Sequence, residues 1–180
     1  MRLIHNYFSI LAFSIVIPTF AHAAPQVTFQ GEVTSQTCKA VINGESEGTV
    51  LLPTVPVSEL DTAGKTAGLT PFTISVSGCT VSTTSELKIG TKFLGHNVTS
   101  TGNLGNVATT NAAQNVSIQL TADANGSTPV TLNGVTTVQG LVLPINQSAA
   151  SHQFAARYYA EDIATPGAIT AVAEYTLSYP

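Results

Sequence analysis

Short runs of residues that alternate between an apolar and a polar face recur from residue 27 onward, and no segment among them carries a convincing helical period. The clearest run closes the sequence. In "AVAEYTLSYP" (171–180), the alanines at 171 and 173 share one face with Tyr175, Leu177 and Tyr179. The other runs are "QVTFQGEV", "GTVLLP", "FTISVSGC", "ELKIGTKFLG", "NVSIQLTA", "PVTLNG", "VQGLVLPI" and "HQFAARYYA". Asn-Gly dipeptides, typical of hairpin turns, stand between several of them. Eight or nine short strands with this spacing predict an all-β antiparallel sandwich.

Two polar segments are predicted as connections between strands. Residues 58–71 have the Gly, Thr and Ala content of a connector, in which Ser58 and Asp61 resemble a capping box and predict one helical turn. Residues 95–114 are rich in Gly, Asn and Thr and are predicted as an exposed loop or a weak strand.

The first 23 residues have the features of a signal peptide. Arg2 precedes an apolar run from Phe8 to Ile17, and Ala21 and Ala23 form the small-x-small pattern that a signal peptidase recognises. The run is shorter than the roughly 20 residues that a membrane span needs. We therefore expect export, with cleavage after Ala23; cleavage after Ala21 and a retained anchor are the alternatives.

The charge balance argues against nucleic acid as a partner. Without Arg2, five basic residues stand against ten acidic ones, a formal net charge of −5. Binding of phosphate backbones needs clustered Lys and Arg, and none is present. Only 9% of the chain is charged, so charge repulsion between copies is weak. This composition is compatible with a secreted protein that assembles with itself, although many monomeric secreted proteins share it.

Both cysteines, Cys38 and Cys79, lie beyond the expected cleavage site. In an exported chain, two cysteines have one possible internal pairing, and closing a loop of this length stabilises a fold by about 4 kcal/mol in the chain-entropy model. Two distant thiols without a Cys/His cluster do not make a metal site. We therefore predict a Cys38–Cys79 disulfide and no bound metal or other cofactor.

The residue types that enzymes need are scarce. The expected mature chain retains His96 and His152, which we interpret as ordinary solvated or hydrogen-bonded histidines. No nucleophile elbow, phosphate loop or zinc signature is present. Glu161 and Asp162 are adjacent carboxylates, but neighbouring side chains diverge in a strand, so a solvated loop is favoured over a metal site. We expect no catalytic activity.

Four stretches give the chain its resemblance to a known family. They are "VTFQGEVTSQTC" (27–38), "PFTISVSGC" (71–79), "FAARYYAEDIATPG" (154–167) and the terminal "AVAEYTLSYP". Together they resemble the type 1 fimbrial (pilus) subunits of the chaperone/usher pathway of Gram-negative bacteria. Gly167, fourteenth from the end of the sequence, and the penultimate Tyr179 stand where that family has Gly and Tyr. The likeness extends over residues 26–180.

The resemblance implies an incomplete immunoglobulin-like sandwich that lacks its last strand, so that one strand edge and a groove of apolar core are open. In that family a periplasmic chaperone first lends a strand to the groove, and the N-terminal segment of another subunit then replaces it. A head-to-tail contact of this kind does not close on itself and builds a filament. The partners implied are other subunits, the chaperone and an outer-membrane usher, with export through the periplasm to a surface fimbria that mediates adhesion and colonisation.

The resemblance also assigns roles to individual residues. It divides the chain into a signal peptide (1–23), a donor segment that merges into the first strand (24–34) and a pilin domain (35–180). The expected donor residues are Val27, Phe29, Gly31 and Val33, and the expected acceptor residues are Gly167, Ala173, Tyr175, Leu177 and Tyr179. The alternative for the donor residues is an ordinary first strand that packs in the chain's own core.

One departure from the family pattern bears on the type of subunit. Rod-forming members generally have a dozen or more mature residues before the Val-x-Phe-x-Gly motif, whereas only Ala24, Pro25 and Gln26 stand there if cleavage follows Ala23. A minor or adaptor subunit is therefore an alternative to a rod subunit. A weak receptor-binding adhesin is a second alternative, although the expected mature chain has no room for a separate lectin domain.

Overall fold

Eight strands and one short 3-10 helix make up the described part of the chain, residues 31–180 of a computed structural model. The strands are β1 (Lys39–Ile42), β2 (Thr66–Ser77), β3 (Leu87–Gly95), β4 (Leu104–Gly105), β5 (Val116–Thr121), β6 (Thr136–Leu143), β7 (Ala150–Ala160) and β8 (Ala173–Ser178), and the 3-10 helix is η1 (Val57–Leu60). Within residues 31–180 no helix is long and apolar enough to cross a membrane.

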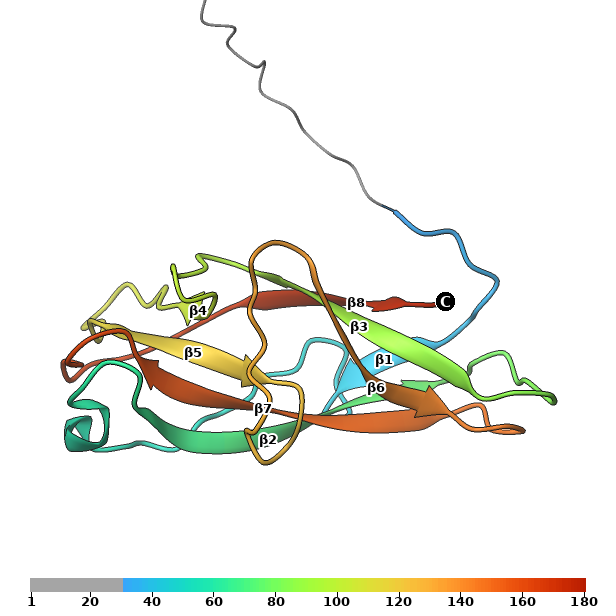
Figure 1. Cartoon of the computed structure of the whole chain (residues 1–180), viewed down its shortest axis with the longest axis horizontal. Helices are drawn as coiled ribbons and strands as arrows, with labels where there is room; N and C mark the ends of the chain where they lie inside the picture. Colours follow the sequence, from blue (N-terminus) through green and yellow to red (C-terminus); the bar gives the residue numbers. More distant parts are fainter. Residues whose placement is uncertain (1–30) are drawn as a thin grey trace, which may run out of the picture. The chain divides into compact units, whose positions relative to one another are not determined.

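The strands form two antiparallel sheets. The first has the order β1-β2-β7-β5-β4 and the second the order β6-β3-β8. Figure 1 shows β2 and β7 running along one layer and β3 and β8 along the other. The predicted all-β sandwich is confirmed, and Glu32–Pro180 form one compact unit.

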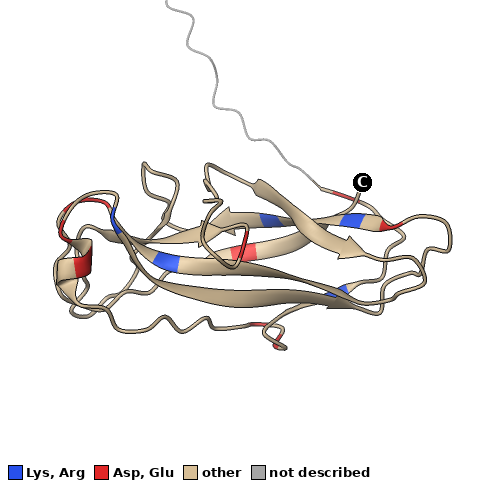
Figure 2. Cartoon of the chain, turned by 60° about the horizontal axis from the view of Figure 1, so that its bottom comes forward, with Lys and Arg blue, Asp and Glu red and all other residues tan. Residues whose placement is uncertain are grey.

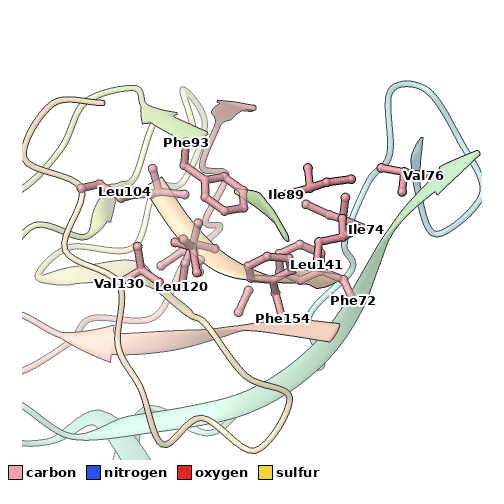
Figure 3. Close-up of a cluster of buried hydrophobic side chains, with 14 of the residues drawn as sticks. Phe72, Ile74, Val76, Ile89, Phe93, Leu104, Leu120, Val130, Leu141 and Phe154 are labelled. Carbon is pink, nitrogen blue, oxygen red and sulfur yellow. The ribbon is translucent and has the colours of Figure 1, made fainter. Parts of the chain in front are cut away.

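The core lies between the two sheets and is built from the apolar faces that the alternation predicts. Phe154 of β7 is central to it: its ring stacks on Phe72 at a centroid distance of 5.6 Å and meets Phe93 edge-on at 5.4 Å. In Figure 3 these rings point toward one another, with Ile74 and Leu141 beside them. Burial of such side chains, at about 25 cal/mol per Å² of apolar surface, stabilises the sandwich.

Cys38 and Cys79 form the predicted disulfide. The bridge joins the residue before β1 to the loop after β2, two strands that already pair through Lys39 and Ser77. Cys79 is buried against the core. The disulfide therefore fastens the outer strand of the larger sheet to its neighbour.

Three local predictions need correction. The runs "GTVLLP" and "PVTLNG" are not strands in the structure, although Pro129 forms an isolated bridge with Thr121. The helical turn exists as η1, but its N-cap is Pro56 and no side chain caps it, so the capping box is wrong. Segment 95–114, predicted as an exposed loop or a weak strand, contains the two-residue strand β4, and both of its residues are buried.

Charged side chains are sparse over both sheets. Figure 2 shows Lys, Arg, Asp and Glu scattered singly, with acidic residues at η1 and in loops. Among residues 31–180 the ion pairs within 4 Å are Lys65–Asp61, Lys92–Glu32 and His96–Glu174. The sheet surfaces are thus mainly polar and uncharged, as the composition predicts.

Candidate functional site

Strand β8 lies at the edge of the smaller sheet and pairs, among the described residues, with β3 alone. The amide of His96 donates to the carbonyl of Val172, which places the polar backbone groups of Val172 on the β3 side. Because these groups alternate along an antiparallel strand, those of Ala173, Tyr175, Leu177 and Tyr179 face the other side. This open edge is a row of backbone donors and acceptors that an added strand could pair with.

An apolar groove of about 550 Å³ lies beside this edge. One side is the stretch from Ile169 to Tyr175, and the opposite side is the segment from Gly48 to Leu52. Core side chains from both sheets form the floor: Phe72, Phe93, Leu104, Ile118, Leu120 and Ala156. A groove whose floor is core and whose rim is an unpaired strand edge is the shape that an extended apolar segment fits.

A second hollow of about 460 Å³ continues from this groove toward η1. Tyr158 and Ile169 border both cavities. Its walls include Val55, Leu60 and the backbone around Gly167, and the small cluster of Leu60, Ala113, Val116 and Ala160 lies beneath it. The apolar surface open to solvent therefore extends along β8 and along residues 164–169, which belong to the lead-in to β8, the segment before that strand.

Asn106 fixes the chain that leads into β8. Its Nδ2 donates to the carbonyls of Ala113 (3.0 Å) and Ala168 (2.8 Å), and its Oδ1 accepts from the amides of Ala108 (2.9 Å) and Thr170 (3.0 Å). One side chain thus joins two segments more than 60 residues apart in sequence. Asn106 lies in the segment predicted as an exposed loop or a weak strand, and no sequence pattern marks it for a role.

Gly167 lies where backbone segments cross closely. A Cβ at this position would stand 2.4 Å from both the amide nitrogen of Ala113 and the carbonyl oxygen of Asn111. Ala168, the next residue, donates to Asn111 O (2.7 Å) and accepts from Ala113 N (2.9 Å). Glycine is therefore the residue that allows the lead-in to β8 to pair with segment 111–113.

Of the predicted acceptor residues, Ala173, Tyr175 and Leu177 belong to β8, whereas Gly167 and Tyr179 lie outside the strand. Ala173 and Tyr175 line the groove, whereas Leu177 and Tyr179 are half-buried against the core beyond it. Partial burial raises the pKa of the Tyr175 phenol. Gly167 borders the second hollow. Gly167 precedes β8 and Tyr179 follows it directly, and their role as acceptor residues stays a prediction.

The predicted donor residues divide between described and undescribed parts of the chain. Val27 and Phe29 lie outside the described residues. The backbone at Gly31 is open, since a Cβ there would meet no atom within 4 Å. Val33 is fully exposed, with a relative accessibility of 104%. Val33 therefore has no packing site within Glu32–Pro180.

The titratable residues singled out from the sequence have structural contacts. His96 Nε2 lies 3.0 Å from Glu174, and His152 Nε2 lies 2.7 Å from the carbonyl of Ala122 with its ring edge-on to Phe154. In residues 31–180 no group of three or more His, Cys, Asp or Glu is placed to hold a metal ion.

Glu161 lies in the loop after β7, as predicted, but is half-buried, whereas its neighbour Asp162 is exposed. Its carboxylate accepts hydrogen bonds from the hydroxyls of Ser117 (2.6 Å), Thr99 (2.9 Å) and Thr101 (2.8 Å) and, at 3.4 Å, from Asn103. Burial opposes ionisation, but these donors outweigh it and lower the pKa of Glu161. The carboxylate holds the β3–β4 connection against β5.

Comparisons with known proteins agree with this architecture. The family model described as fimbrial protein matches residues 27–180. The chain belongs to the fimbrial protein family. It is 36% identical to the F17 fimbrial protein of Escherichia coli over 99% of both chains, and 36% identical to the major fimbrial subunit SMF-1 of Stenotrophomonas maltophilia over 90% of this chain and 96% of that one.

Among solved structures, a chaperone-usher pilus subunit superposes with a TM-score of 0.59 at 19% identity, over 91% of this chain and 100% of that one. That likeness shows a shared immunoglobulin-like pilin fold. Fimbrial relatives of this chain carry the names of both major and minor subunits. The chain is thus a structural fimbrial subunit, a component of surface fimbriae.

Proposed function

We propose that this subunit polymerises by donor-strand exchange, in which the groove beside β8 accepts the N-terminal segment of another subunit. The observation that carries the proposal is the apolar groove along an unpaired strand edge. An added strand would satisfy the open backbone groups and cover the apolar floor at once. The acceptor residues are Gly167, Ala173, Tyr175, Leu177 and Tyr179.

The groove and the proposed donor segment have the same length. The groove borders the chain from Ile169 to Tyr175, and the donor motif extends from Val27 to Val33; each is seven residues long. At roughly 3.3 Å per residue an extended segment of this length spans about 20 Å. Burying a Val or Phe side chain in the groove would contribute about 1.5–3 kcal/mol each.

The partners in this proposal are other fimbrial subunits, joined head to tail, together with a periplasmic chaperone that covers the groove during transit and an outer-membrane usher that passes subunits to the surface. An exposed apolar groove favours aggregation, which supports the need for the chaperone. The signal peptide at residues 1–23 would direct export. The role is structural, in adhesion and colonisation as part of the fibre, and includes no catalysis.

The test replaces one donor side chain at a time and measures fibre assembly in cells that express the matching chaperone and usher. Phe29→Asp places a charge on the donor face and is expected to abolish assembly while the chaperone-bound subunit still accumulates. Thr28→Asp, on the opposite face of the same extended segment, is the matched control and is expected to assemble. Normal fibres from Phe29→Asp would refute the donor assignment.

The choice between a rod subunit and a minor or adaptor subunit depends on the length of the donor segment. Sequencing the N-terminus of subunits in assembled fibres measures it directly. Cleavage after Ala23 leaves three residues before Val27, which favours the minor or adaptor role. Counting this subunit per fibre by quantitative mass spectrometry provides the second measurement, since a rod subunit would be the most abundant component.

A further inference from the structure

Glu32 stands between two predicted donor residues, yet its carboxylate contacts the far end of the same chain. Oε1 accepts a hydrogen bond from the backbone amide of Tyr179 (2.8 Å). Oε2 lies 3.2 Å from the hydroxyl of Ser178 and 3.3 Å from Nζ of Lys92. The hydrogen bond from the Tyr179 amide, followed by the contacts with Lys92 and Ser178, lowers the pKa of Glu32.

The Tyr179 amide lies one residue beyond β8 and continues its open edge. By the alternation along this strand, it faces the same side as the amides of Ala173, Tyr175 and Leu177. Glu32 therefore occupies the last of the backbone donors that an incoming strand could use. Within residues 31–180 the remaining three have no partner, and the groove borders the first two of them.

The same contact restrains the donor side of the subunit. Val33 follows Glu32 directly and is fully exposed, so no apolar contact within Glu32–Pro180 holds it in place. While the carboxylate of Glu32 is bound to Tyr179, Val33 remains next to the end of its own β8. The polar contacts of Glu32 are then what keeps Val33 from entering the groove of another subunit.

We infer that Glu32 caps the open edge of its own β8 in the unpolymerised subunit, and that it is displaced when a donor strand pairs along this edge as far as Tyr179. This inference rests on the proposed donor-strand function. It assigns Glu32 a positioning role: the residue limits how far an incoming strand can pair and how much of its own segment is released. The partner that displaces it is the N-terminal segment of a second copy of this chain.

The test measures binding of a fluorescent synthetic peptide, with the sequence of residues 24–34, to the purified subunit. Removing the cap with Glu32→Ala is expected to raise the association rate about fivefold, in line with the loss of a modest charge-assisted hydrogen bond. Glu174→Ala is the matched control. Glu174 is an exposed carboxylate on β8, and it contacts the side chain of His96 instead of a backbone amide of the open edge. Its rate should equal that of the unmodified subunit.

An equal or slower rate for Glu32→Ala would overturn the inference while leaving donor-strand binding intact. Failure of the peptide to bind any of the three proteins would instead refute the proposed function. Hydrogen exchange of the Tyr179 amide, followed by NMR without peptide, tests the cap independently of binding. We expect exchange about fivefold faster in Glu32→Ala than in the unmodified or Glu174→Ala subunit, and identical exchange in all three would show that no cap exists.

Discussion

Replacing Asn106 by Ala should weaken the fold at the lead-in to the last strand. The side chain makes four hydrogen bonds, and two of its partners, Ala168 and Thr170, lie just before β8. A hydrogen bond contributes about 0.5–1.5 kcal/mol net, which gives about 2–6 kcal/mol for four. Asn106 is only half-buried, so water can satisfy some of the released groups. We therefore expect a loss of about 3 kcal/mol in the free energy of unfolding.

Urea unfolding of the purified subunit, followed by circular dichroism, measures this loss. With a slope of about 2 kcal/mol per M, the expected shift of the midpoint is about 1.5 M. Asn133→Ala is the matched control, since Asn133 is exposed and has no side-chain hydrogen bond within residues 31–180. Its midpoint should stay within about 0.3 M of the unmodified protein.

The reasoning fails if Asn106→Ala shifts the midpoint no more than Asn133→Ala does. The variant should also bind the donor peptide more weakly, because Ile169 of the groove wall lies between Ala168 and Thr170, the two residues that Asn106 binds. A large loss of stability with unchanged peptide binding would show that Asn106 supports the fold without shaping the groove.

Three further predictions concern other fixed points of the structure. Replacing Cys38 and Cys79 together by Ala should lower the free energy of unfolding by about 4 kcal/mol relative to the oxidised protein, as measured by urea unfolding, and an unchanged midpoint would contradict it. Gly167→Ala places a methyl group against backbone atoms, which cannot rotate away, and should reduce both stability and fibre yield; normal amounts of fibre would refute this. The amides of residues 127 and 128 and the hydroxyl of 127 lower the pKa of Asp123 to about 2. Because its folded pKa is depressed, the stabilisation is complete above about pH 4 and is lost as the pH falls toward 2. The difference in melting temperature between Asp123→Asn and the unmodified protein should therefore shrink over that range, and a constant difference would argue against it.

The sequence alone predicted the fold class, the disulfide and most of the strands. Alternation identifies a strand when one of its faces is core, and this holds for "FTISVSGC", whose Phe72, Ile74 and Val76 are all buried. The strand prediction failed for "GTVLLP" because alternation shows which side chains are apolar. It does not show whether the backbone has a neighbouring strand to pair with. Segment 48–52 forms one side of the groove and pairs with no strand of residues 31–180.

Alternation predicted the terminal strand β8, but it did not predict the polar residues that hold this part of the chain in place. Asn106, Glu32 and Glu161 act through hydrogen bonds that connect positions 44 to 147 residues apart in sequence. No local pattern identifies such a residue. An Asn in a Gly-rich loop and a Glu beside a Gly have the same appearance whether they are solvated or act as the centre of a network.

Hydrogen bonds from Asn106 and Glu32 hold the chain at the two ends of β8. Asn106 fixes the chain at residues 168 and 170, just before the strand, and Glu32 holds it at Ser178 and Tyr179. Between these points the strand from Ala173 to Leu177 pairs with β3 and, among the residues that the structure describes, with no strand on its other side. A strand held at both ends has already lost most of the backbone freedom that pairing would cost, at about 1–2 kcal/mol per residue. In the proposed exchange, an incoming donor would meet a preorganised edge, and more of the energy of filling the groove would be expressed as affinity.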